Sequence, residues 1–125
     1  METQVALLLP QDRYDGAAPC KVLYLLHGLG QNASSWQRYS GLELMLQQQN
    51  VVAVMPEAQR SFYCDMTYGS DYFTYITHEL PQFVSRTIKV SQKREDTIIA
   101  GLSMGGFGAL KCGLSHPELF GACAS

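Results

Sequence analysis

The sequence predicts its clearest chemistry in one pentapeptide, Gly101-Leu102-Ser103-Met104-Gly105, which fits a Gly-x-Ser-x-Gly motif. In such a motif a serine stands on a sharp turn between a strand and a helix, and a side chain at either glycine would collide with its neighbours. The turn exposes the serine hydroxyl and directs the unpaired N–H groups of the following helix towards whatever this hydroxyl attacks. We therefore predict that Ser103 is a nucleophile beside a site for developing negative charge.

The flanks of the motif favour this interpretation over a chance match. A bare Gly-x-Ser-x-Gly pattern occurs by chance in about 4% of chains of this length if Gly and Ser each make up roughly 7% of residues. Here, however, residues 97–100 form a short apolar run that suits a strand buried on both faces of a parallel sheet. Residues 105–113 are rich in small side chains, which let a helix pack closely on a sheet.

A second glycine-containing turn supplies another part of the predicted site. Residues 21–26 are predicted to form a buried strand, which ends at His27-Gly28-Leu29-Gly30. The two glycines allow the backbone to turn sharply and to point an N–H group inward beside Ser103. For His27 we favour a structural role, in which its ring holds this loop by hydrogen bonding, over the role of catalytic base.

The rest of the chain alternates strands with helices. Two further strands and two helices are predicted, over residues 3–9, 51–55, 41–49 and 71–88. Ser40 and Glu43 have capping-box spacing, and Pro81 predicts a kink or a break near Leu80. This βαβ rhythm predicts an α/β fold with a mostly parallel sheet and helices on both faces.

Several aromatic and polar residues leave two interpretations open. Residues 57–68 form a polar and aromatic loop after the carboxyl end of a strand, where open α/β sheets collect ligands, so their rings either contact substrate or pack. Trp36 either lines an acyl pocket or anchors packing. The aromatic stripe of residues 71–88 is interpreted as a core face, and His78 and Glu79 are assigned to that helix rather than to catalysis.

Composition excludes several other classes. The chain has 125 residues, 46% of them apolar and 16% charged, which is typical of one globular domain. A formal net charge of −2 without a basic cluster argues against nucleic acid as a partner. Residues 5–9 are too short for a signal or a membrane span, so a cytoplasmic protein is expected. The four cysteines have neither zinc-site nor redox-pair spacing, and we interpret them as buried or free thiols: Cys20, Cys64, Cys112 and Cys123.

Four segments together resemble a known family: His27-Gly28-Leu29-Gly30, Arg60-Ser61-Phe62-Tyr63-Cys64-Asp65-Met66, Glu79-Leu80-Pro81 and Gly101-Leu102-Ser103-Met104-Gly105-Gly106. Nearly the whole chain resembles the esterase D-like α/β-hydrolases, most closely the bacterial tributyrin esterases. The same broad group includes S-formylglutathione hydrolases, feruloyl esterases and mycolyltransferases. The resemblance therefore implies acyl transfer, usually to water, from a small-molecule ester or thioester, without a cofactor or metal.

The resemblance also assigns roles to individual positions. It implies that Ser103 is the nucleophile, that the Met104 N–H is the first oxyanion donor and that the Leu29 N–H is the second. His116-Pro117-Glu118 matches a structural helix end. In this fold an acid and then a histidine follow the serine, but only 22 residues follow Ser103 here. His116 lies about 20 Å along the predicted helix, and a hydrogen bond needs about 3 Å.

We therefore expect residues 1–125 to be a partial domain, the N-terminal half of an α/β-hydrolase fold. It would be truncated after the elbow helix, lack the C-terminal strands and the first strand, and be nearly inert alone. The strand before Ser103 would then be an exposed sheet edge, through which an oligomer could form. The favoured function is a serine carboxylesterase for short acyl groups that works through an acyl-enzyme. The alternatives are an acyltransferase with the same machinery, or a non-catalytic remnant or binding module.

Overall fold

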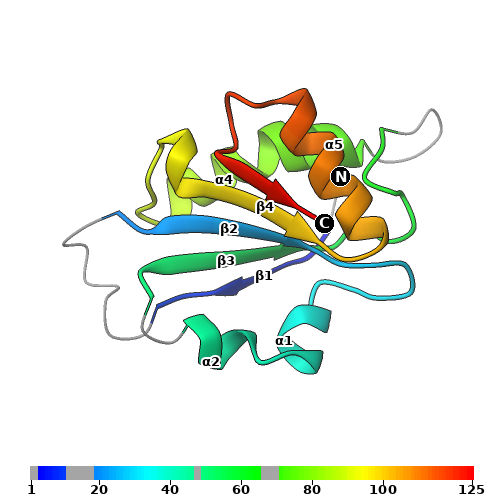
Figure 1. The fold of residues 1–125 in the computed structure, drawn as a ribbon, viewed down its shortest axis with the longest axis horizontal. Helices are drawn as coiled ribbons and strands as arrows, with labels where there is room; N and C mark the ends of the chain where they lie inside the picture. Colours follow the sequence, from blue (N-terminus) through cyan, green and yellow to red (C-terminus); the bar gives the residue numbers. More distant parts are fainter. Residues whose placement is uncertain (1–2, 11–18, 47–48, 66–70) are drawn as a thin grey trace.

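Five strands form one mixed sheet in the order β1-β3-β2-β4-β5 (Figure 1). The computed structural model describes residues 3–10, 19–46, 49–65 and 71–125. β1 runs antiparallel to β3, and the other neighbouring pairs are parallel, which confirms the predicted mostly parallel sheet. The strands are β1 (Val5–Leu8), β2 (Lys21–Leu26), β3 (Val51–Pro56), β4 (Thr97–Gly101) and β5 (Ala122–Ala124).

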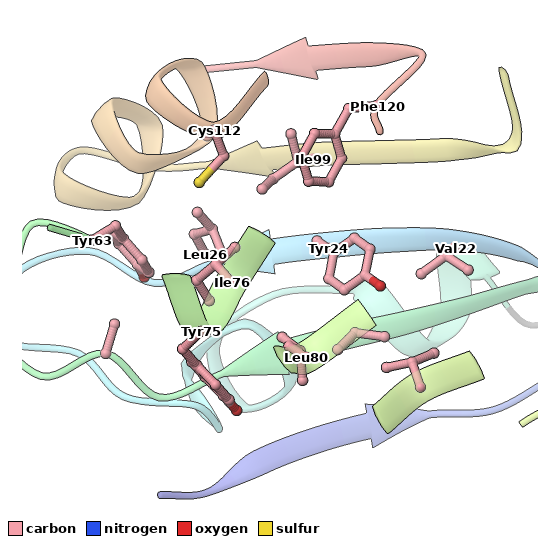
Figure 2. Packing of buried hydrophobic residues seen from close by; sticks show 14 of the residues in the cluster. Val22, Tyr24, Leu26, Tyr63, Tyr75, Ile76, Leu80, Ile99, Cys112 and Phe120 are labelled. Carbon is pink, nitrogen blue, oxygen red and sulfur yellow. The ribbon is translucent and has the colours of Figure 1, made fainter. Parts of the chain in front are cut away.

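Helices cover both faces of this sheet, as predicted (Figure 1). The strands β2 and β3 alternate their side chains between two apolar clusters, because successive residues of a strand point to opposite faces. The larger cluster lies under α4 and α5, and Figure 2 shows part of it. The smaller one lies under α1 and α2. The helices are α1 (Ser35–Tyr39), α2 (Leu42–Leu46), α3 (Tyr72–Thr74), η1 (Tyr75–Glu79), α4 (Leu80–Thr87), η2 (Arg94–Asp96) and α5 (Met104–Ser115).

One of the two predicted helices is shorter than expected. The helix expected over residues 41–49 is α2, which is five residues long. Residues 47–48 and the Glu43 side chain of the expected capping box lie outside the described part.

No helix in the described part of the chain has the length and apolarity needed to cross a membrane.

Pro81 changes the hydrogen-bond pattern of its helix without breaking the helix. The five residues of η1 form a π-helical turn, and the N–H of Leu80 donates to the carbonyl of Tyr75, five residues back. Glu79 and Leu80 both keep right-handed helical dihedrals. Pro81 follows shortly after this turn and has no N–H to donate, so the displaced bonding of the π turn lies where the proline interrupts the regular pattern. The predicted irregularity near Leu80 is therefore present, but as a π turn rather than a break.

The expectation that β4 is an exposed sheet edge is wrong. β5 pairs with β4 over three residues, from Ile98↔Ala122 to Ala100↔Ala124. The chain is brought back beside β4 by the Gly121 N–H, which donates to the Thr97 carbonyl at 2.8 Å. Within the described part, the sheet therefore ends at β5 on one side and at β1 on the other.

The two neighbouring isoleucines of β4 provide a test of this arrangement. Ile99 is fully buried in the larger cluster, whereas Ile98 is 39% exposed. We expect Ile99→Ala to lower the free energy of unfolding by about 2–5 kcal/mol, because it leaves a cavity in the core. Ile98→Ala should cost less than half as much. Urea unfolding followed by circular dichroism measures both, and equal costs would contradict the assignment of the faces.

Candidate active site

Ser103 occupies the strained turn that the sequence predicts. It lies between β4 and α5 with φ of 59° and ψ of −117°, a conformation that a residue with a Cβ rarely adopts. Holding such a residue there costs on the order of 1–3 kcal/mol. The residue is exposed, and the backbone leaves it as a helix, since the Phe107 N–H donates to the Ser103 carbonyl at 3.0 Å. The Ser103 side chain is thus accessible at the N-terminus of α5.

The two motif glycines let α5 approach the end of β2. A Cβ at Gly105 would lie 2.7 Å from the His27 carbonyl oxygen and closer still to that of Leu26. A Cβ at Gly101 would lie 2.9 Å from the Gly105 Cα, inside the distance at which carbon atoms repel. The predicted collisions are therefore confirmed at both positions.

The loop after β2 lies against this turn. A Cβ at Gly28 would lie 3.5 Å from the Cβ of Ser103. The loop closes on itself, because the Gly28 N–H donates to Gln31 Oε1 at 2.7 Å and the Gln31 N–H donates to the Gly28 carbonyl at 3.1 Å. Gly30 has φ of 78°, which glycine adopts without strain. Leu29, which is 51% exposed, therefore lies at the tip of a tight turn, next to Gly28.

His27 anchors this loop, as the sequence indicates. Its ring is 1% exposed, and Nε2 accepts the Ala58 N–H at 2.9 Å. Nδ1 lies 2.9 Å from the Gly28 carbonyl, so this nitrogen carries the proton and donates. Glu57 Oε2 lies 3.3 Å from Nε2, but the lone pair there is already used by Ala58. Both ring nitrogens are therefore committed to backbone groups, and neither is free to act as a base.

Sequence reasoning missed Glu57 and Tyr63, two supports of the same loop. The Glu57 carboxylate accepts the N–H groups of Ala33 at 3.1 Å and of Gln59 at 2.8 Å, which ties the loop after β2 to the loop after β3. The Tyr63 hydroxyl donates to the His27 carbonyl at 2.9 Å. The position of Glu57 directly after the carboxyl end of β3 was a usable signal. Tyr63 offered no signal, because its packing partners are distant in sequence.

The loop after β3 divides its aromatic residues between packing and the surface. Tyr63 is fully buried with φ of 58°, and burial raises its pKa far above the usual range of tyrosine. Phe62 is 45% exposed. Its ring lies edge-on to that of Phe107 of α5, with 6.1 Å between the two ring centres. One of the two rings therefore packs, while the other lies near the first turn of α5. Residues 66–68 of the predicted loop lie outside the described part.

Trp36 is an anchor for packing, and it also borders a hollow. Its indole Nε1–H donates to the Leu26 carbonyl at 3.1 Å, and its ring packs against the smaller apolar cluster. With Leu102, the residue before Ser103, it lines a cavity of about 90 Å³ whose other lining residues are Gln31, Ser35 and Ser40. The role of Trp36 in an acyl pocket remains a prediction.

The remaining histidines lie away from Ser103. His116 caps the C-terminus of α5, a helix of 12 residues, which places it about 18 Å from the N-terminal end. Its Nδ1 lies 2.8 Å from Glu118 Oε1, and its ring lies 5.4 Å from that of His78. This arrangement matches the structural helix end that the sequence predicts. Among the residues that the structure describes, no group of three or more His, Cys, Asp or Glu side chains could hold a metal ion.

Comparisons with known proteins agree with this geometry. Residues 1–125 match the family model described as "Putative esterase". The chain is 34% identical to an acetyl esterase of Caldicellulosiruptor saccharolyticus, over 94% of this chain and 47% of the relative. It is 30% identical to S-formylglutathione hydrolase of Bos taurus, over 90% of this chain and 46% of that protein.

A solved structure is similar over the same span. It is that of the fluorophosphonate-binding serine hydrolase FphF of Staphylococcus aureus, with a TM-score of 0.89 and 34% sequence identity over 98% of this chain and 50% of that one. The chain thus spans about half the length of the relatives it matches, which agrees with the expected N-terminal half of an α/β-hydrolase fold.

The contact between Gly105 and β2 can be tested by adding a single methyl group. We expect Gly105→Ala to lower the free energy of unfolding by about 1–3 kcal/mol or more. The methyl group would overlap backbone atoms, which cannot move without shifting the chain segment to which they belong. Gly41→Ala is the matched control, since a Cβ at Gly41 meets nothing within 4 Å. Thermal unfolding compares the two variants, and similar stabilities would contradict the close approach of α5 to β2.

Proposed function

Because this chain belongs to the esterase family whose model it matches from end to end, we propose that the protein is a serine carboxylesterase. It would cleave short-chain acyl esters, thioesters included, through an acyl-enzyme on Ser103. The observation that supports this best is the exposed, strained Ser103 at the N-terminus of α5, beside the loop of Gly28. The relatives named acetyl esterase and S-formylglutathione hydrolase support small acyl groups on oxygen or sulfur. A specific likeness to tributyrin esterases stays a prediction.

The proposed chemistry begins with attack of the Ser103 Oγ on the acyl carbonyl carbon. The carbonyl oxygen becomes an oxyanion, and two backbone N–H groups stabilise it. One is that of Met104, which has no intrahelical partner because Met104 is the first residue of α5. The other is that of Leu29, at the tip of the adjoining turn. The alcohol or thiol then leaves, and water releases the acid from the acyl-enzyme.

The histidines described above do not supply Ser103 with a base. An unassisted serine hydroxyl is a weak nucleophile at neutral pH and needs an adjacent base. The ring of His27 is occupied by backbone groups, and His116 lies at the far end of α5. We therefore propose that the acid and the base come from outside these residues, and that residues 1–125 alone are inactive. A cytoplasmic location and pairing through a sheet edge remain predictions as well.

A fluorophosphonate probe tests the nucleophile. In the product of the complete reading frame, we expect the probe to label the wild-type protein and Ser85→Ala, whose exposed serine lies on α4. We expect Ser103→Ala to lose both labelling and hydrolysis of 4-nitrophenyl butyrate, because the attacking oxygen is gone. Hydrolysis by Ser103→Ala at the wild-type rate would show that the assignment is wrong. Product analysis with added alcohols distinguishes a hydrolase from an acyltransferase.

Two substitutions at one position test the second oxyanion donor. Leu29→Pro removes the N–H group, and we expect kcat/KM to fall about 10²- to 10³-fold. Leu29→Ala keeps the N–H group and should retain most of the activity. Circular dichroism confirms that both variants are folded. If the two variants lose activity equally, the Leu29 N–H is not an oxyanion donor.

A further inference from the structure

Two half-exposed aromatic rings lie near the turn of Ser103. Phe107 belongs to α5 and Phe62 to the loop after β3, and the two rings lie edge-on with 6.1 Å between their centres. We propose that Phe62 and Phe107 form a wall that binds the alcohol group of the ester and favours alcohols that carry an aromatic ring. This inference rests on the proposed esterase function and adds to it a preference among substrates.

The geometry of α5 places Phe107 near Ser103. The Phe107 N–H donates to the Ser103 carbonyl at 3.0 Å, so the two residues are one helical turn apart. Side chains of an α-helix lean towards its N-terminus, and each covers the turn before its own Cα. The ring of Phe107 therefore lies over the first turn of α5, which begins at Ser103.

Phe62 is directed to the surface by a strained turn. Phe62 and Tyr63 have φ of 52° and 58°, values that bulky residues rarely adopt. Tyr63 is fixed by its hydrogen bond to the His27 carbonyl at 2.9 Å and by its ring, which fills the space beside Gly108. With Tyr63 buried, the ring of Phe62 lies outside, against Phe107. Backbone strain of this kind is concentrated at active sites and ligand-binding sites.

The exposed pair offers a surface that suits a third ring. Neither Phe62 nor Phe107 belongs to the two apolar clusters that the described residues form. An aromatic ring has a negative face and a positive edge, so rings attract one another in edge-on and offset-stacked arrangements. A ring on the substrate can add to this pair in either way. An aliphatic group of similar size can gain only the burial of its apolar area.

Two surfaces near Ser103 differ in how open they are. The cavity of about 90 Å³ beside Leu102 limits the size of the group that it admits. The wall of Phe62 and Phe107 is open to solvent. In the proposed reaction the alcohol leaves after the first step, whereas the acyl group stays on Ser103 until water attacks. The open wall therefore suits the alcohol, and the cavity suits a short acyl group.

Matched esters test the wall in the product of the complete reading frame. Benzyl acetate and ethyl acetate share the acyl group and have alcohols of similar acidity, so the ratio of their kcat/KM values reports recognition of the alcohol. We expect Phe62→Ala and Phe107→Ala each to lower this ratio about two- to tenfold, because each removes one ring contact. Phe83→Ala should leave the ratio unchanged, since Phe83 lies on α4 and is exposed to a similar extent, 47% against 50% for Phe107. An unchanged ratio in both wall variants overturns the proposal.

Two further variants separate an aromatic preference from simple apolar bulk. Phe107→Tyr keeps a ring and should keep the benzyl-to-ethyl ratio near that of the wild-type protein. Phe107→Leu keeps much of the apolar volume but not the ring, and it should lower the ratio as Phe107→Ala does. If Phe107→Tyr and Phe107→Leu give the same ratio, the preference for a ring is wrong.

A third ester distinguishes the alcohol side from the acyl side. Ethyl phenylacetate carries its ring on the acyl group, so its kcat/KM relative to ethyl acetate should not respond to Phe62→Ala or Phe107→Ala. A response confined to this ester would assign the wall to the acyl group and overturn the proposal. So would an equal loss of kcat/KM for all three esters together with lowered thermal stability, because that result would assign the rings to packing.

Ser103→Ala separates a failure of the wall from a failure of the proposed esterase function. If Ser103→Ala abolishes hydrolysis of all three esters while the wall variants leave both ratios unchanged, the esterase assignment holds and the wall is wrong. If Ser103→Ala hydrolyses the esters at the wild-type rate, both proposals are wrong.

Discussion

The architecture depends on one contact between two backbones, that of α5 at Gly105 and that of β2 at its carboxyl end. No side chain fits between them, because even a methyl group at Gly105 would overlap the carbonyl groups of Leu26 and His27. A helix can come this close only if the preceding strand stops abruptly. The parallel register of β2 and β4, which places Leu26 beside Gly101, sets where it stops. The positive φ of Ser103 is the consequence, and the buried face of α5 offsets its strain.

A second layer of contacts fixes the loop that faces Ser103. His27, Glu57 and Tyr63 lie behind it, and their hydrogen bonds connect the loops that follow β2 and β3. All three side chains satisfy backbone groups, among them the buried N–H of Ala58 and the buried carbonyl of His27. The tip at Leu29 is left as the part that faces outward. The proposed role of the Leu29 N–H as an oxyanion donor would benefit from this, because backbone N–H groups that are fixed before a substrate arrives need no reorganisation when charge develops.

Much of this could be predicted from the sequence where the cause is local. The spacing of Gly101, Ser103 and Gly105 specifies the turn, and short apolar runs specify the central strands. The pairing of β5 with β4 escaped prediction, because three residues are too few to show a periodicity and the pairing depends on how Gly121 aligns with Thr97. The π turn before Leu80 was also out of reach, because a proline predicts a disturbance but not which carbonyl accepts the displaced bond. The support from Tyr63 depends on residues distant in sequence.

Tyr63 and Gly108 form a pair whose two members constrain each other. A Cβ at Gly108 would lie 2.6 Å from the Tyr63 Cγ and 2.9 Å from its Cβ, so the ring occupies the space that a side chain on α5 would need. In descendants of this chain, a larger residue at position 108 is compatible only with a smaller one at position 63. That smaller residue would leave the His27 carbonyl in need of a new donor. Positions 63 and 108 are thus bound to diverge together, and a donor for the His27 carbonyl must then come from another residue.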